Sequence, residues 1–226
     1  MWRYGGFPIS TEYAILNFMD NPAPFAEPKD RSSLPVPDRR RTELVRKALH
    51  FLIALSPPMA GCNRAYTLIF LGAGTLAYVG MEALRCRGLR IPLISFLTVF
   101  ASRRRDRGRF VLGPVTLGVG AFLSLLLFPP QVAAIAIYAL AFGDGTASLA
   151  GKFFGRIRPP FLFHKSLEGS VACFLGAFVS AWLVSGDLRT ALTAAGAATA
   201  AELLPIRDWD NIIVPLVTGA AVRFLL

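Results

Sequence analysis

Long apolar stretches with few charged residues alternate along the chain with short stretches rich in arginine and lysine. A helix needs about 20 mainly apolar residues to cross the hydrocarbon layer of a bilayer. Such stretches lie at 46–62, 66–84, 110–128, 131–150, 168–185, 188–204 and 210–226. The pattern predicts an all-α protein, a polytopic bundle of about seven transmembrane helices.

Two further segments do not fit the pattern of a spanning helix. The segment 91–101 is apolar but has only 11 residues, so we expect it to be re-entrant or interfacial. Residues 1–43 contain several prolines and charges and lack the compact apolar core of a secretory signal. We expect 1–43 to be a cytosolic, partly disordered N-terminal arm and 44–226 to be a transmembrane catalytic domain.

The distribution of basic residues predicts the orientation. If the segment 91–101 does not cross the membrane, 18 lysines and arginines lie on one side of it. This count leaves out the distal part of the N-terminal arm. Only Arg64, Arg189 and Arg223 lie on the other side. The positive-inside rule then places the N-terminus in the cytosol. Because the net charge of +10 gathers at the ends of apolar runs, we expect anionic headgroups and nucleotide phosphates as partners, and no nucleic acid.

Acidic residues gather on the same, cytoplasmic side. The group consists of Glu82, Asp106, Asp144, Glu168, Glu202, Asp208 and Asp210, whereas Asp187 alone lies on the far side. Ionisable groups in membrane segments are costly and usually mark a functional site. The pattern predicts a polar pocket, able to bind a metal ion, at the cytoplasmic face.

The stretch FGDGTASLAGKFFG (142–155) is the richest in candidate chemistry. In a helix, Asp144, Ser148, Gly151 and Gly155 would share one face. The small residues at intervals of four would also suit close helix packing, which is the alternative explanation for the glycines. Packing does not need a carboxylate, so Asp144 indicates coordination of Mg²⁺ beside nucleotide phosphates.

The segment HKSLEGS (164–170) predicts the start of a helix beside a phosphate site. Ser166 is suited to cap the helix, with Glu168 in its first turn. Lys165 offers a positive charge to a phosphate, although a lysine that only anchors the helix at the membrane surface is the alternative. A short basic hairpin should bring Gly151–Gly155 face to face with Lys165–Gly169.

A third polar segment is ELLPIRDWDN (202–211). Pro205 should break the preceding helix and leave Asp208, Asp210 and Asn211 on a turn. Oxygen ligands at such a break suit a divalent ion, and Asp210 and Asn211 are the stronger candidates. Asp208 could equally be a solvated surface residue.

Two weaker features lie near the ends of the first two predicted spans. Arg46, Lys47 and His50 lie at the mouth of the first span, where anchoring explains them as well as catalysis does. Glu82 and Arg85 are three residues apart and could form a purely structural ion pair.

Six motifs, taken in order, resemble the polyprenol kinase family, which comprises dolichol kinase, phytol kinase and CTP-dependent diacylglycerol kinase. They are RKALH (46–50), EALR (82–85), GRFVLGP (108–114), GDGTASLAGKFFG (143–155), KSLEGS (165–170), and Glu202 followed by Asp210–Asn211. The resemblance covers about 46–220 and leaves only the arm outside. One position departs from the family: Asp106 stands where members often carry a glutamate.

The resemblance implies Mg²⁺-dependent transfer of the γ-phosphoryl group from CTP to the hydroxyl of a membrane lipid, which is polyprenol or dolichol, phytol or diacylglycerol. Together with the motifs, it assigns catalysis to Asp144, Lys165 and His50, and the metal ion to Asp144, Glu168, Asp210 and Asn211. The nucleotide would be bound by Gly143, Ser148, Gly151, Lys152, Gly155, Lys165, Ser166 and Gly169. Supporting roles fall to Arg46, Glu82, Arg85 and Glu202. The general base stays open between Asp144 and His50, and so does the existence of a homodimer.

Two other functions compete with the kinase. Phosphatidate cytidylyltransferase shares a similar GD…G…FG and KS-EG pattern, but its usual C-terminal motifs are absent, and ELLPIRDWDN stands in their place. An ion-coupled transporter would use the acids for coupling, but transporter sites usually lie near the middle of the membrane rather than at one face.

Overall fold

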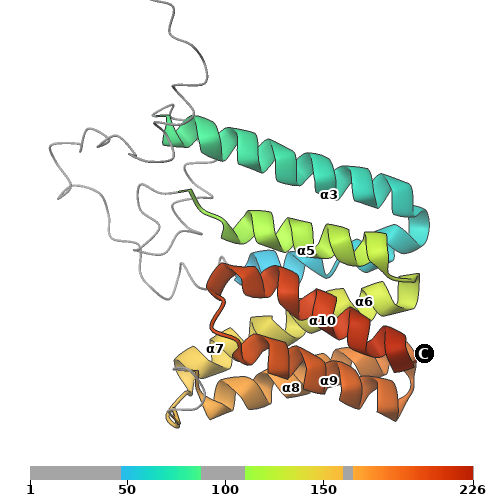
Figure 1. Cartoon of the computed structure of the whole chain (residues 1–226), viewed down its shortest axis with the longest axis vertical. Helices are drawn as coiled ribbons and strands as arrows, with labels where there is room; N and C mark the ends of the chain where they lie inside the picture. The colour runs from blue at the N-terminus through green and yellow to red at the C-terminus, as the bar shows by residue number, and fades with distance from the viewer. Residues whose placement is uncertain (1–46, 88–109, 160–164, 226) are drawn as a thin grey trace, which may run out of the picture. The chain divides into compact units, whose positions relative to one another are not determined.

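The computed structural model describes residues 47–87, 110–159 and 165–225, all within one compact unit, Pro37–Leu226. Apart from short connections these residues are helical, and no strand occurs among them. The predicted all-α class is therefore confirmed for the described ranges (Figure 1). The predicted arm 1–43 and the short apolar segment 91–101 lie outside them.

The helices follow one another along the chain with short connections. After a helical stretch at 47–53 come α3 (Ser56–Cys86), α5 (Gly113–Leu127), α6 (Pro130–Tyr138), the π-helix η2 (Ala139–Asp144), α7 (Gly145–Phe153), α8 (Leu167–Ser185), α9 (Leu188–Leu203), the 3₁₀-turn η4 (Arg207–Trp209) and α10 (Asp210–Leu225). Helices α3, α5 and α6 each carry a proline in their first two positions. Proline suits this place because it lacks the N–H that would have no partner there.

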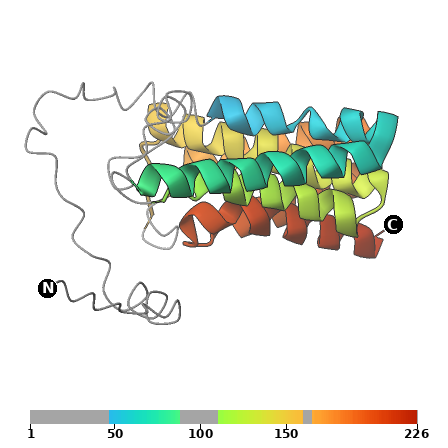
Figure 2. The ribbon, with the colours of Figure 1, turned by 90° about the horizontal axis from the view of Figure 1, so that it is seen from above.

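The boundary between the first two predicted spans coincides with a break inside α3. Asn63 has extended backbone angles (φ −156°, ψ 104°) within an otherwise helical segment. Its side-chain oxygen accepts a hydrogen bond from the N–H of Tyr66 at 2.9 Å, which caps the helix that follows. Figures 1 and 2 show the chain changing direction at this point.

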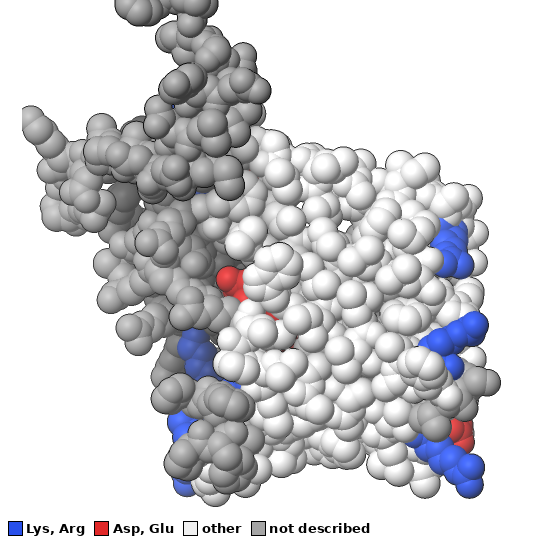
Figure 3. Space-filling view, in the orientation of Figure 1, with Lys and Arg blue, Asp and Glu red and all other residues white. Residues whose placement is uncertain are grey.

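Three helices are long and apolar enough to cross a membrane: Ser56–Cys86, Pro130–Phe153 and Leu167–Ser185. In the most apolar part of Pro130–Phe153, 67% of the residues are buried, against 17% and 33% in the other two, so this helix forms the centre of the bundle. Figure 3 shows a broad uncharged face with lysine and arginine side chains at opposite ends, as expected of a protein embedded in hydrocarbon.

Small residues allow α8 to pack closely against the central helix. A Cβ atom on Gly176 would lie 2.6 Å from the backbone oxygen of Phe142 and 2.8 Å from Oγ1 of Thr146. The hydroxyl of Thr146 donates to the backbone oxygen of Ala172 at 3.0 Å. This close contact fixes the end of η2, and therefore the position of Asp144, against α8.

We expect Gly176→Ala to destabilise the protein by about 1–3 kcal/mol, because the added methyl group would meet backbone that cannot move freely. The matched control is Gly196→Ala in α9, where an added Cβ meets nothing within 4 Å. That change should be neutral or stabilising by up to about 1 kcal/mol, the helix-propensity difference. Thermal unfolding in detergent measures both variants, and equal melting temperatures would contradict the packing role of Gly176.

The end of the bundle with Arg64 and the α8–α9 connection has its own local stabilisation. Arg64 donates hydrogen bonds to the backbone oxygens of Leu125 and Leu126 at the C-terminus of α5, where a positive charge is favourable. Asp187 caps α9 by accepting a hydrogen bond from the N–H of Thr190. This hydrogen bond helps to hold the pKa of the Asp187 carboxyl below its usual range.

Candidate active site

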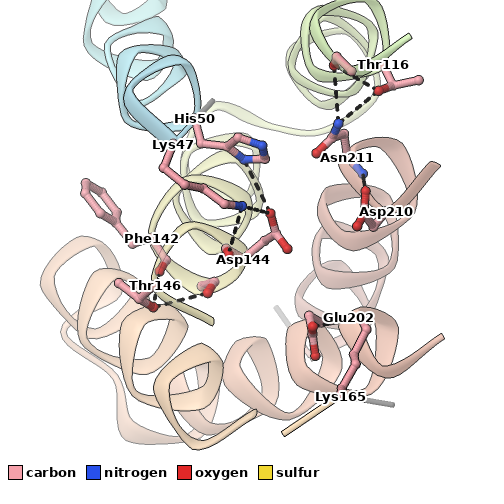
Figure 4. A network of polar contacts seen from close by, with 12 residues as sticks. Lys47, His50, Thr116, Phe142, Asp144, Thr146, Lys165, Glu202, Asp210 and Asn211 are labelled. Atoms are coloured by element: carbon pink, nitrogen blue, oxygen red, sulfur yellow. Dashed lines mark hydrogen bonds and ion pairs between the residues drawn. The ribbon is translucent and has the colours of Figure 1, made fainter. Parts of the chain in front are cut away.

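Several helix ends that carry the sequence motifs meet at one end of the bundle. They are the stretch 47–53, the junction of η2 with α7, the N-termini of α8 and α10, and the C-terminus of α9 (Figure 1). Figure 4 shows their polar side chains directed toward a common region. The prediction that distant motifs converge on one face is therefore confirmed for the described residues.

Asp144 forms the centre of a buried charged cluster. Its Oδ2 accepts a hydrogen bond from Nζ of Lys47 at 3.0 Å and lies 3.5 Å from Nδ1 of His50. Lys47, His50 and Asp144 are only 2%, 3% and 5% exposed. A buried ion pair is costly to maintain unless its geometry is good, so this cluster indicates a specific role rather than general stabilisation.

The π-helix η2 places Asp144 where it can reach the first helical stretch. In a π-helix the backbone hydrogen bonds join residues i and i+5, and such segments are rare and often found at functional sites. Nζ of Lys47 also lies 3.3 Å from the backbone oxygen of Asp144, at the end of this segment. The main chain and side chain of Asp144 thus bind the same lysine.

Asp210 and Asn211 begin α10 beside this cluster. The charges of Asp144, Lys47 and Lys165 all act on the carboxylate of Asp210. Asn211 donates hydrogen bonds from Nδ2 to the Gly113 oxygen at 3.3 Å and to Oγ1 of Thr116 at 2.9 Å, which ties α10 to α5. Its amide nitrogen is thereby occupied, while its amide oxygen points away from Thr116 (Figure 4).

Lys165 and Glu202 form a second ion pair at the edge of the cluster. Nζ of Lys165 lies 2.7 Å from Oε1 of Glu202. The side chain of Lys165 is 27% exposed, so it can reach an incoming anion without unfolding its surroundings. Among the described residues, Oε2 of Glu202 has no hydrogen-bond partner although it is buried. This pair therefore retains unused hydrogen-bonding capacity at the accessible side of the site.

The glycines of the two central motifs pack against each other. A Cβ on Gly151 would lie 2.8 Å from Oγ of Ser166 and 3.6 Å from Cα of Gly169. Ser166 caps α8 by accepting from the N–H of Gly169 at 3.1 Å. The predicted cap, and the predicted approach of Gly151–Gly155 to Lys165–Gly169, are confirmed. This close contact favours the packing explanation for these glycines, and nucleotide binding by them stays a prediction.

One expectation about this segment was wrong. Helix α7 ends at Phe153, so Gly155 lies outside it and cannot share a helical face with Asp144. Gly155 nevertheless stays close to Ser166, because a Cβ on Gly155 would lie 2.7 Å from its Oγ.

The four predicted metal ligands are not gathered at one point. Glu168 accepts hydrogen bonds from the N–H groups of Arg156 and Ile157 at 2.9 and 3.1 Å, so it fastens the loop before α8. In the part of the chain that the structure describes, no three His, Cys, Asp or Glu residues form a metal-binding group. Mg²⁺ usually takes only one or two protein carboxylates together with nucleotide phosphates, so metal binding by Asp144 and Asp210 stays a prediction.

The remaining predicted residues take different places. Glu82 is fully buried and forms a two-bond ion pair with Arg85, at 2.8 and 2.7 Å, so the predicted pairing is confirmed. Oε1 of Glu82 also accepts from the N–H of Val111 at 2.9 Å, which joins α3 to the segment before α5. Ser148 is half-buried and Lys152 is exposed. Arg46 lies outside the described residues.

Sequence reasoning gave too little weight to Lys47. The sequence leaves Lys47 open between anchoring and catalysis and predicts no partner for it, yet it is the buried partner of Asp144. The available signal was its spacing of three residues from His50, which places both side chains on one helical face. Thr116 was also missed, and only the fold shows that it binds Asn211.

Several curated proteins are similar to this chain. A probable chloroplastic phytol kinase of Triticum aestivum is 30% identical over 172 residues, covering 68% of this chain and 57% of the relative. The phytol kinase of Synechocystis is 35% identical over 152 residues, covering 63% of this chain and 64% of the relative. CTP-dependent diacylglycerol kinase 1 of Schizosaccharomyces pombe is 24% identical over 154 residues, covering 67% of this chain and 71% of the relative.

In each of these three relatives the similarity covers about two thirds of this chain. The chain spans between half and two thirds of the length of the three relatives matched most significantly. No protein-family model and no solved structure matches it. The chain belongs to the polyprenol kinase family of lipid kinases.

Proposed function

We propose that the protein is a Mg²⁺-dependent lipid kinase that transfers the γ-phosphoryl group of CTP to the hydroxyl of a membrane lipid alcohol. The observation that carries the proposal is the buried cluster of Lys47, His50 and Asp144, which lies beside Asp210 and Lys165 at one end of an apolar bundle. Relatives named phytol kinase and CTP-dependent diacylglycerol kinase support both the reaction and the nucleotide.

The reaction forms a bond between the lipid oxygen and the γ-phosphorus and breaks the bond from that phosphorus to the β-phosphate oxygen. The products are a lipid monophosphate and CDP, and the hydroxyl proton passes to a base. Since Oδ2 of Asp144 already accepts from Lys47, we assign the base to His50. Phosphoryl transfer depends mainly on positioning and charge neutralisation, and bound Mg²⁺ would supply neutralisation of the phosphates.

The other site residues hold the two substrates. Asp144 and Asp210 are the carboxylates that would bind the metal ion, and Lys47 keeps Asp144 in position. Lys165 binds the β- and γ-phosphates, and Glu202 holds its ammonium group in place until the nucleotide arrives. Asn211 orients the first turn of α10 through its contacts with α5.

The proposed topology has seven spans, a cytosolic N-terminus, an arm at 1–43 and a catalytic domain at 44–226 with its site on the cytoplasmic face. It is tested by cysteine labelling in a variant whose Cys62, Cys86 and Cys173 are replaced by alanine. Asp106→Cys should react with an impermeant maleimide only after cells are permeabilised. The control Arg189→Cys should react in intact cells, and the reverse pattern would contradict the orientation.

The activity is tested with purified protein, γ-labelled CTP and a panel of phytol, a long-chain polyprenol, dolichol and a diacylglycerol. The proposal predicts label in one lipid monophosphate, together with one CDP for each phosphate transferred, and loss of both when a chelator removes divalent ions. If no lipid alcohol acquires label at any divalent ion concentration, the proposed function is wrong.

A further inference from the structure

An apolar cavity of about 320 Å³ lies between the first helical stretch, α3 and α5. Leu49 and Ile53 line it from the first stretch, Gly74 and Tyr78 from α3, and Leu117 from α5. Its volume is at the lower end of the roughly 300–1,000 Å³ usual for small-molecule sites. None of the residues that the proposed chemistry uses is among its lining residues.

This cavity, which we call the α3–α5 groove, opens toward the apolar surroundings of the bundle. Leu52 and Phe70 line it and are more than half exposed. Phe70 lies within Ser56–Cys86, one of the three helices apolar enough to cross a membrane. A groove on such a helix meets hydrocarbon rather than water, so an apolar molecule is the occupant that its chemistry suits.

One end of the groove adjoins the charged cluster. Leu49 lies between Lys47 and His50 in sequence, and its side chain lines the groove while theirs contact Asp144. On the other wall Pro114 lines the groove and directly follows Gly113, whose oxygen accepts from Asn211. The apolar groove and the polar cluster therefore lie next to each other at the start of the first helical stretch and of α5.

The groove is elongated in the direction of the helices. Tyr78 and Thr67 both line it and are eleven residues apart in α3, which corresponds to about 16 Å along a helix axis. Tyr78 lies toward the helix end near Val111, since its hydroxyl donates to the Val111 oxygen at 3.3 Å. A long narrow shape of this kind suits one extended hydrocarbon chain.

We infer that the α3–α5 groove binds one hydrocarbon chain of the acceptor lipid and directs its hydroxyl group toward His50 and Asp144. The inference rests on the proposed function and deepens it, because it places the acceptor on the side of the cluster opposite to α8 and α9. The nucleotide then approaches from the side of Lys165, and the two substrates meet at Asp144. Acceptor selection would depend on the groove rather than on the charged residues.

A substitution at Gly74 tests the inference with little risk to folding. Gly74 lines the groove and a Cβ added there meets nothing within 4 Å, so Gly74→Leu adds apolar volume at the groove from a position with open space around the Cβ. Gly80→Leu is the matched control, because Gly80 is exposed on the same helix, its Cβ also meets nothing within 4 Å, and it does not line the groove. Because Gly80 lies six residues after Gly74 in the same helix, a side chain there points in a different direction from one at Gly74.

We expect Gly74→Leu to lower kcat/KM for the lipid alcohol by about 10-fold or more, the scale on which a change of shape in an apolar pocket acts. The loss should lie mainly in KM for the lipid, while KM for CTP stays unchanged. Gly80→Leu should behave as the unmodified protein. Equal kinetics for all three proteins, or equal losses in both variants, would overturn the inference.

A binding measurement separates this inference from the proposed function. A long-chain isoprenoid alcohol carrying a photoreactive diazirine at the end of its chain should cross-link to α3, and Gly74→Leu but not Gly80→Leu should abolish the cross-link. No nucleotide is needed, so this result stands even if no lipid is phosphorylated. Absence of cross-links to α3 in the unmodified protein would overturn the inference. It would mean that another occupant, such as the chain's own apolar segment 91–101, fills the groove.

Discussion

Asp144→Asn should lower the rate of lipid phosphorylation by at least about 1,000-fold, the upper end of the effect of removing one electrostatic group from a preorganised site. The amide keeps the shape of the side chain but loses the charge that binds Lys47 and, as proposed, the metal ion. CTP turnover at saturating substrate measures the effect. Activity within tenfold of the unmodified protein would remove Asp144 from the catalytic machinery.

The same change carries a structural cost that must be separated from the chemical one. Lys47 is 2% exposed, and its described partners are the carboxylate and the backbone oxygen of Asp144. Removing one member of a buried ion pair typically costs about 3–5 kcal/mol of folding stability. Asp144→Asn should therefore unfold at a lower temperature than the unmodified protein.

The double variant Lys47→Gln with Asp144→Asn serves as the control. Neutralising both members leaves no uncompensated charge. The double variant should therefore be less destabilised than the sum of the losses in the two single variants. Activity should not recover, because the carboxylate is still absent. If the double variant regains both stability and turnover, the pair is purely structural and the proposed role of Asp144 is wrong.

Lys165→Met should raise KM for CTP by about 10- to 100-fold, because a hydrogen bond to a charged group contributes roughly 1.5–3 kcal/mol. Methionine keeps the apolar stem and removes the ammonium group that now lies 2.7 Å from Glu202. The effect on kcat should be smaller, since the positions of Asp144 and His50 do not depend on this pair. Initial rates over a range of CTP concentrations measure it.

Two controls make this prediction specific to phosphate binding. Arg223→Met removes a basic residue from α10 near its last turn, far along the helix from Asp210, and should leave KM for CTP unchanged. Lysine replaced by arginine at position 165 should recover part of the affinity, because arginine also binds phosphate. An unchanged KM in Lys165→Met would show that this lysine only pairs with Glu202.

Local sequence signals predicted the local structure well. The helix start at Ser166, the break after Glu202 and the pair Glu82–Arg85 depend on residues within a few positions of each other, and the structure shows all three. The break in the helix at Asn63 also lies in the gap between the predicted stretches 46–62 and 66–84. Capping, proline and helical spacing act over one or two turns, so a single sequence contains enough information to place them.

Long-range pairs could not be predicted in the same way. Lys47 and Asp144 are 97 residues apart, and no periodicity shows that a lysine at the start of one helix meets a carboxylate at the end of another. The hydrogen bond between Asn211 and Thr116, which are 95 residues apart, was missed for the same reason. In both cases the decisive interaction is tertiary packing, which outweighs local propensity.

Parallel reactions with γ-labelled and α-labelled CTP test whether the cluster around Asp144 directs the γ-phosphoryl group of CTP to a lipid hydroxyl. We expect the acceptor lipid to take up the γ-label alone, CDP to retain the α-label, and Asp144→Asn to abolish both signals. Transfer of the α-label to lipid with release of pyrophosphate, as a cytidylyltransferase would produce, would contradict this role of the cluster.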